Sequence, residues 1–118
     1  MFREAPLPPP RSALKWAAVD LAQTIAQGVW TPEDPTRQIG PPIIENVRKL
    51  EQLDKAGWKI AIHTSRSWGD YETIEMWLNF HHIPWSRIVC GKLLAGIYVD
   101  DRAVHESEDD WSRGQEAP

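Results

Sequence analysis

Ala17-Ala18-Val19-Asp20-Leu21-Ala22-Gln23-Thr24 is the stretch that decides the fold class, together with a second stretch near the other end, Ile97-Tyr98-Val99-Asp100-Asp101-Arg102. Each is a short apolar run that breaks into carboxylate, which is typical of a buried parallel strand. In an open parallel sheet, ligands bind beyond the carboxyl ends of the strands. Two such strands side by side would gather Asp20, Asp100 and Asp101. Because three carboxylates repel one another, the pattern predicts a Mg²⁺ ion among them.

The residues between these two stretches predict alternating helices and strands. Apolar residues at helical spacing predict a helix that starts after Pro42 and ends at Gly57, and a second helix is expected over 70–81. Strands are expected over 59–63 and 87–90. The apolar positions of the two helices are Ile44, Val47, Leu50, Leu53, Ile74, Trp77 and Leu78. This alternation predicts an α/β fold, a three-layer, doubly wound, Rossmann-like sheet of about four mostly parallel strands.

Polar residues follow the other strands as well. Thr64, Ser65 and Arg66 come directly after the strand over 59–63, and Lys92 precedes the Asp100 strand. In chain order the pattern is Asp, Thr/Ser, Lys, Asp-Asp. Over about residues 15–105 this order resembles the haloacid dehalogenase-like hydrolase superfamily, in particular its small phosphatase-like members without a cap domain.

The resemblance implies a Mg²⁺-dependent phosphatase. Asp20 would be the nucleophile that forms an aspartyl-phosphate, with Thr64 and Lys92 as the other catalytic residues. The implied metal ligands are Asp20, the Ala22 carbonyl, Asp100 and Asp101. The implied substrate-binding residues are Thr64, Ser65, Arg66, Lys92 and Trp30.

Ala22 departs from the family pattern Asp-x-Asp-x-Thr, whose second aspartate is the general acid/base. An alanine methyl cannot transfer a proton, and general acid–base catalysis typically contributes about 10²–10⁴-fold in rate. We therefore expect a weakened phosphatase. Two alternatives remain: an impaired relative that binds a phosphorylated ligand or partner without turnover, and a phosphonatase-like chemistry in which Asp-x-Ala is native. That chemistry takes a lysine from a cap domain, for which this chain has no room.

The expected ligand is a phosphorylated small molecule, with a nucleotide or a nucleic-acid end as a further candidate. Trp30 lies in a loop at the expected active-site end, where an aromatic ring can stack on a base or sugar. Without a cap domain the site is open, which favours a large substrate or closure by a second subunit in a homo-oligomer. His63 should point away from Thr64, because side chains alternate along a strand, and is expected to be a packed residue.

Chain length, composition and the positions of proline-rich and acidic segments predict the domain organisation. The 118 residues suit one domain, and the net charge of −4 gives no sign of a polyanion groove. We expect a Pro-rich flexible leader over 1–12, an α/β domain over 13–105 with a flap-like loop over 28–42, and an acidic flexible tail over 106–118. One cysteine, Cys90, and the absence of a membrane-length apolar run favour a cytoplasmic protein that does not enter membranes.

Overall fold

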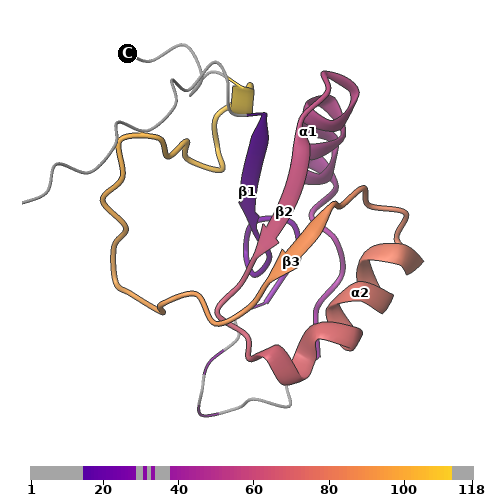
Figure 1. Cartoon of the computed structure of the whole chain (residues 1–118), viewed down its shortest axis with the longest axis vertical. Coiled ribbons are helices and arrows are strands. Elements are labelled where there is room, and N and C mark those ends of the chain that lie inside the picture. The colour runs from indigo at the N-terminus through magenta and orange to yellow at the C-terminus, as the bar shows by residue number, and fades with distance from the viewer. Residues whose placement is uncertain (1–14, 29–30, 32, 34–37, 113–118) are drawn as a thin grey trace, which may run out of the picture.

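The computed structural model describes residues 15–28, 31, 33 and 38–112. The expected leader over 1–12, Trp30 and much of the flap-like loop lie outside these residues. The element order is β1 (Trp16–Asp20), α1 (Ile44–Lys55), β2 (Lys59–His63), a short 3₁₀ turn η2 (Trp68–Asp70), α2 (Tyr71–Phe80) and β3 (Arg87–Val89). Figure 1 shows the three strands side by side with the two helices beside them.

The sheet is parallel throughout, in the order β1-β2-β3. Asp20 pairs with His63 in the register of β1 and β2, and Ile62 pairs with Ile88 in that of β2 and β3. All three strands therefore end at the same edge. The α/β class with a parallel sheet is confirmed, and the described residues form no cap domain.

One face of the sheet carries the core. Alternate strand residues are buried on this face, where they join apolar residues of both helices in one cluster, because a parallel strand followed by a right-handed crossover packs its helix back onto the sheet. The strand and helix members are Val19, Ile60, Ile62, Ile88, Val47, Leu50, Leu53, Ile74 and Leu78. The predicted apolar positions of the two helices are thus buried, except for Trp77, which is partly buried against the core, and Ile44, which is 55 % exposed.

The opposite face of the sheet is not covered by a helix of the described residues. Its positions alternate with the buried ones, and Trp16, Lys59 and Arg87 are exposed there. The predicted third layer is therefore missing from the described part of the chain. Both crossovers run in the same direction along the sheet, so both helices lie on one face.

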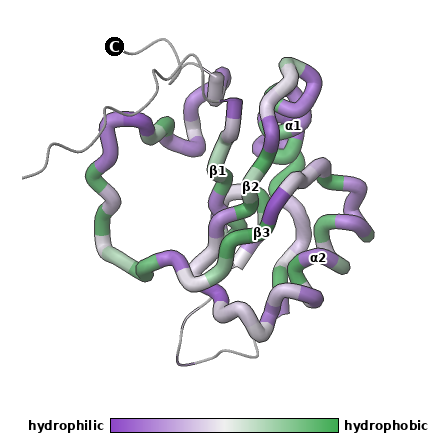
Figure 2. The backbone as a smooth tube through the Cα atoms, in the orientation of Figure 1, coloured by the Kyte–Doolittle hydropathy of each residue, from purple (hydrophilic) through white to green (hydrophobic). Residues whose placement is uncertain are grey.

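The predicted strand over 97–99 is wrong for this structure. Residues 91–100 form no strand, and Ile97 and Val99 are 79 % and 92 % exposed. Figures 1 and 2 show this partly hydrophobic segment arching away from the sheet. The outer edge of β1, where a fourth strand could pair, carries no strand of the described residues.

Residues 106–112 differ from the expected flexible tail, because they fold back onto the domain. Trp111 packs against the core cluster, and its ring lies 5.8 Å from the Lys49 ammonium. Lys49 donates to the Glu106 carbonyl oxygen at 3.0 Å. The rest of that tail, 113–118, lies outside the described residues. No helix in the part of the chain described here is long and apolar enough to cross a membrane.

The base of the loop after β1 is closed by backbone contacts that need a glycine. Gln27 donates its N–H to the Pro41 carbonyl at 2.8 Å, and Ile43 donates to Ile25 at 2.8 Å. A Cβ at Gly40 would lie 2.3 Å from the Gln27 carbonyl oxygen, which is below any normal contact distance. Backbone, not a flexible side chain, would have to move.

We predict that Gly40→Ala lowers the free energy of unfolding by about 1–3 kcal/mol, the usual cost of forcing extra atoms into a packed site. Urea unfolding followed by circular dichroism measures this change. Gly96→Ala is the matched control, because a Cβ there meets no atom within 4 Å. Equal effects of the two substitutions would contradict the close approach at Gly40.

Candidate functional site

The candidate site lies at the carboxyl edge of the sheet, where β1, β2 and the segment after β3 meet. Asp20 ends β1, His63 ends β2, and Lys92 follows β3. Lys92 is placed by a backbone hydrogen bond, since its N–H donates to the Thr64 carbonyl at 2.9 Å. Three of the four predicted motifs therefore converge here, as the parallel topology requires.

An ion pair joins the first and third of these motifs. The Lys92 ammonium lies 3.9 Å from Asp20 Oδ1, and the two side chains are 20 % and 39 % exposed respectively. Lys92 also lies 4.3 Å from the centre of the Tyr98 ring. The ammonium is thus held between a carboxylate and an aromatic face, next to the open end of β1.

Burial and charge act in opposite directions on Asp20. Desolvation raises the pKa of this carboxyl above its usual value, while the Lys92 charge, the Leu21 N–H and the Thr24 hydroxyl lower it. Burial is the largest of these effects. An aspartate that is costly to ionise and is compensated by a fixed cation is common at reactive sites.

Thr24 connects Asp20 to the chain's last described segment. Its hydroxyl lies 3.1 Å from Glu106 Oε2 and 3.5 Å from Asp20 Oδ2. A hydroxyl has one hydrogen to donate, so the shorter contact to Glu106 is the stronger one. The turn itself is held by Asn46, whose side-chain amide donates to the Thr24 carbonyl at 2.7 Å. Sequence reasoning missed Glu106, because no local pattern brings residue 106 back to residue 24.

Thr64 is inside the site but has a supporting position. It is 2 % exposed, and its hydroxyl accepts the Arg66 N–H at 3.2 Å. Its own N–H donates to the Val89 carbonyl at 2.9 Å. In this conformation Thr64 connects β2, β3 and Lys92. The Arg66 N–H donates within the turn, to the Thr64 hydroxyl.

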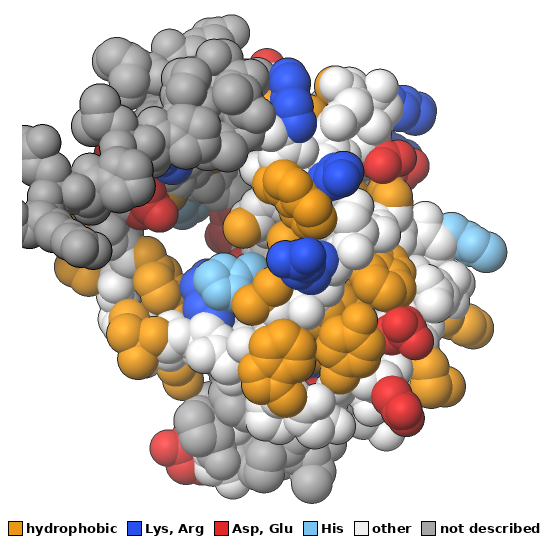
Figure 3. Space-filling view, viewed as in Figure 1, with side chains coloured by type: hydrophobic (Ala, Val, Ile, Leu, Met, Phe, Trp, Pro, Cys, Tyr) orange, Lys and Arg blue, Asp and Glu red, His pale blue; other side chains and the backbone are white. Residues whose placement is uncertain are grey.

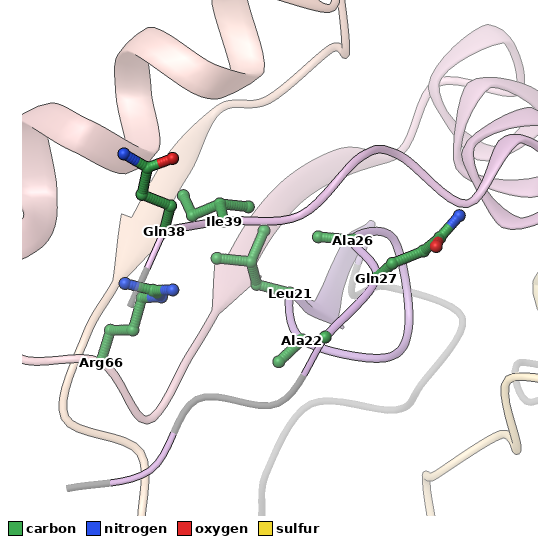
Figure 4. Close-up of a pocket in the computed structure, with 8 residues that line it drawn as sticks. Leu21, Ala22, Ala26, Gln27, Gln38, Ile39 and Arg66 are labelled. Atoms are coloured by element: carbon green, nitrogen blue, oxygen red, sulfur yellow. The ribbon is translucent and has the colours of Figure 1, made fainter. Parts of the chain in front are cut away.

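Arg66 lines a small cavity next to the site. Its guanidinium forms an ion pair with Asp70 at 3.4 Å and is almost fully buried. The cavity, about 10 Å³, is lined by Arg66 and Gln38 on one side and by Ala22 and Gln27 on the other (Figure 4). That volume suits about one water molecule. Ser65, the remaining predicted phosphate ligand, is partly exposed beside Arg66.

His63 has a different environment from the packed position that its sequence predicts. It lies on the open face of the sheet, in register with Asp20, and is only partly buried. Burial and the Lys92 charge lower its pKa, and the Asp20 charge raises it. Alternation along β2 does place it opposite Thr64, but that puts it on the same face as Asp20. The parallel register of β1 and β2, in which His63 pairs with Asp20, would have predicted this position.

The predicted metal ligands do not come together. Asp100 is exposed in the segment over 91–100, and its carboxylate accepts the N–H of Arg102 at 2.8 Å within its own turn. Among the described residues, no group of three or more His, Cys, Asp or Glu side chains could hold a metal ion. The cation that faces Asp20 is Lys92. A Mg²⁺ site made from Asp20, Ala22, Asp100 and Asp101 therefore does not fit this arrangement.

A Mg²⁺ titration by calorimetry tests this arrangement. We predict that Asp100→Ala changes neither the heat nor the affinity of any Mg²⁺ binding, because the Asp100 carboxylate lies away from Asp20. Asp110→Ala, in another exposed turn, serves as the control. Loss of Mg²⁺ binding in Asp100→Ala alone would show that the segment over 97–101 closes onto Asp20 and would overturn this conclusion.

The fold has a counterpart of known structure, although no protein-family model and no curated protein matches the sequence. The chain is similar to the crystal structure of a structural-genomics target from Vibrio cholerae. The two share 27 % sequence identity, with a TM-score of 0.61, over 87 % of this chain and 89 % of that chain. That protein is named only as a target, so the similarity supports a small, parallel, Rossmann-like α/β domain and no activity.

Proposed function

We propose that this chain is a phosphate-ester hydrolase that acts through an aspartyl-phosphate on Asp20. The observation that carries the proposal is the Asp20–Lys92 pair, with 3.9 Å between Oδ1 and Nζ, at the carboxyl edge of a parallel sheet. Ligands of open α/β sheets bind at this edge. A carboxylate there can attack phosphorus, and a neighbouring ammonium can bind the phosphoryl oxygens.

The chain's own residues supply two of the steps. An Asp20 oxygen attacks phosphorus, the bond from phosphorus to the ester oxygen breaks, and the leaving group departs with the electron pair. Lys92 compensates the negative charge on the phosphoryl oxygens and keeps Asp20 ionised against its burial. Water then attacks phosphorus, the bond from phosphorus to the Asp20 oxygen breaks, and the carboxylate is restored. Inorganic phosphate leaves, and the proton of the attacking water passes to solvent.

These steps also need two proton transfers, one to the leaving group and one from the attacking water. Ala22 cannot protonate the leaving group or take a proton from the attacking water. Esters with good leaving groups, such as aryl phosphates, suffer least from that loss. The superfamily resemblance implies Mg²⁺, but the ligands that it implies do not come together here, and none of these steps depends on the ion. Binding of a phosphorylated ligand without turnover is the alternative that Ala22 favours.

We predict slow hydrolysis of p-nitrophenyl phosphate by the wild type, none by Asp20→Asn, and a gain of about 10²-fold or more in Ala22→Asp. The new carboxylate would supply the missing acid. Position 22 lines the small cavity that the buried Arg66 guanidinium also lines, so the substitution places a carboxylate in that cavity. Steady-state phosphate release, with and without added Mg²⁺, is the measurement.

Glu72→Gln is the matched control, since it removes a carboxylate from the first turn of α2. Activity that survives in Asp20→Asn would come from another protein or another residue. If Ala22→Asp gains nothing on any ester while the wild type binds phosphate esters, the binding alternative replaces the hydrolase.

A further inference from the structure

The open face of the sheet combines exposed aromatic rings with cations. Trp16 pairs in register with Lys59, and Arg87 lies opposite Ala61 on the next strand. The Trp16 ring centre lies 5.3 Å from the Lys59 ammonium and 5.3 Å from the Arg87 guanidinium. Among the described residues, no carboxylate forms an ion pair with either cation. We call Trp16, Lys59 and Arg87 the basic–aromatic face.

This surface is accessible and continuous with the candidate site. Trp16 is 43 % exposed, and the small side chains of Ala18 and Ala61 separate it from Asp20 and His63. From Trp16 to Asp20 is four residues of β1, or about 13 Å at 3.3 Å per residue. Figure 3 shows basic and hydrophobic side chains together over the middle of this face.

A second exposed tryptophan lies in the turn η2, against the segment that follows β3. Trp68 is 58 % exposed and stands over Gly91, so that a Cβ there would lie 3.6 Å from its Nε1. It is stacked with Tyr71 at 6.3 Å between ring centres. Gly91 directly precedes Lys92, so this ring contacts the segment that carries the cation of the candidate site. Exposed tryptophan rings thus lie on β1 and against the segment after β3.

We propose that the basic–aromatic face binds single-stranded nucleic acid and leads its terminal phosphate to Asp20 and Lys92. Proteins bind single strands by stacking bases on aromatic rings and tracking the backbone with cations. Against a net charge of −4, two cations that form no ion pair with a carboxylate of the described residues are a local exception that suits a polyanion. An acidic peptide would use the cations but would gain nothing comparable from two exposed indole rings.

Binding to the face is independent of catalysis, whereas delivery of the phosphate rests on the proposed hydrolase. The first test is therefore fluorescence anisotropy of a dye-labelled twelve-residue oligothymidylate without a terminal phosphate, at low salt. We expect saturable binding by the full chain. Trp16→Ala should weaken it about tenfold, the order expected for one lost stacking partner.

Lys59→Gln combined with Arg87→Gln should weaken binding further and reduce the slope of log affinity against log salt by about 1.4, since each phosphate contact to a single strand contributes about 0.7. Lys55→Gln, at the end of α1, is the control and should change neither quantity. Circular dichroism confirms that each variant is folded.

Three outcomes would overturn the proposal: no binding by the wild type, equal binding by the Lys59→Gln/Arg87→Gln variant, or preferential binding of a polyglutamate peptide, which would indicate an acidic protein partner. The second test adds a terminal phosphate to the oligonucleotide and measures phosphate release. Binding without release, in a protein that does hydrolyse aryl phosphates, removes only the delivery step. If the protein binds the oligonucleotide but hydrolyses no ester, the binding role of the basic–aromatic face stands and the proposed hydrolase is rejected.

Discussion

The partly buried Asp20 carboxylate at the end of β1 is the constraint on which the rest of the site depends. Burial disfavours its ionised form, and Lys92 is the nearest compensating charge. Lys92 is held in position to compensate this charge because its N–H donates a hydrogen bond to the Thr64 carbonyl. The Thr64 N–H in turn donates to the carbonyl of Val89, the last residue of β3. The buried Thr64 and the parallel register of the strands together hold the Lys92 ammonium opposite the Asp20 carboxylate.

Helices of the described residues cover only one face of the sheet that carries this pair. Parallel sheets are normally buried on both faces. Here the core face packs against α1 and α2, while the other face presents Trp16, Lys59 and Arg87 next to the Asp20 site. The proposed binding surface and the proposed reactive site share this open face, an arrangement that suits a long, charged ligand better than a small apolar one.

Local sequence patterns predicted the elements that pack locally. The spacing of Val47, Leu50 and Leu53 predicted α1, Gly57 marked its end, and the three strands lie where short apolar runs predicted them. The superfamily resemblance implied that Asp20 and Lys92 share a site, and the two residues do converge. The edge argument applied to Asp20, Asp100 and Asp101 failed, because residues 97–99 form no strand.

Features that depend on contacts between residues far apart in the sequence could not be predicted in this way. Ile97, Tyr98 and Val99 have the composition of a strand, but a strand also needs a partner edge, and no local pattern says whether β1 offers one. The return of Glu106 and Trp111 to the domain depends on Lys49, more than fifty residues away. The partly buried position of His63 depends on which face of the sheet the helices cover, and no helix of the described residues covers the face on which His63 lies.

The most direct test of the central claim is a pH titration of the Asp20 carboxyl by ¹³C nuclear magnetic resonance, in metal-free buffer, for the wild type and Lys92→Met. We predict an Asp20 pKa above the ordinary value of an aspartate, because desolvation dominates, and a still higher pKa in Lys92→Met, because the compensating charge is gone. The carboxylate would then ionise only at higher pH. An ordinary or lowered pKa in the wild type, or the same pKa in both proteins, would contradict the claim that Lys92 compensates a buried Asp20.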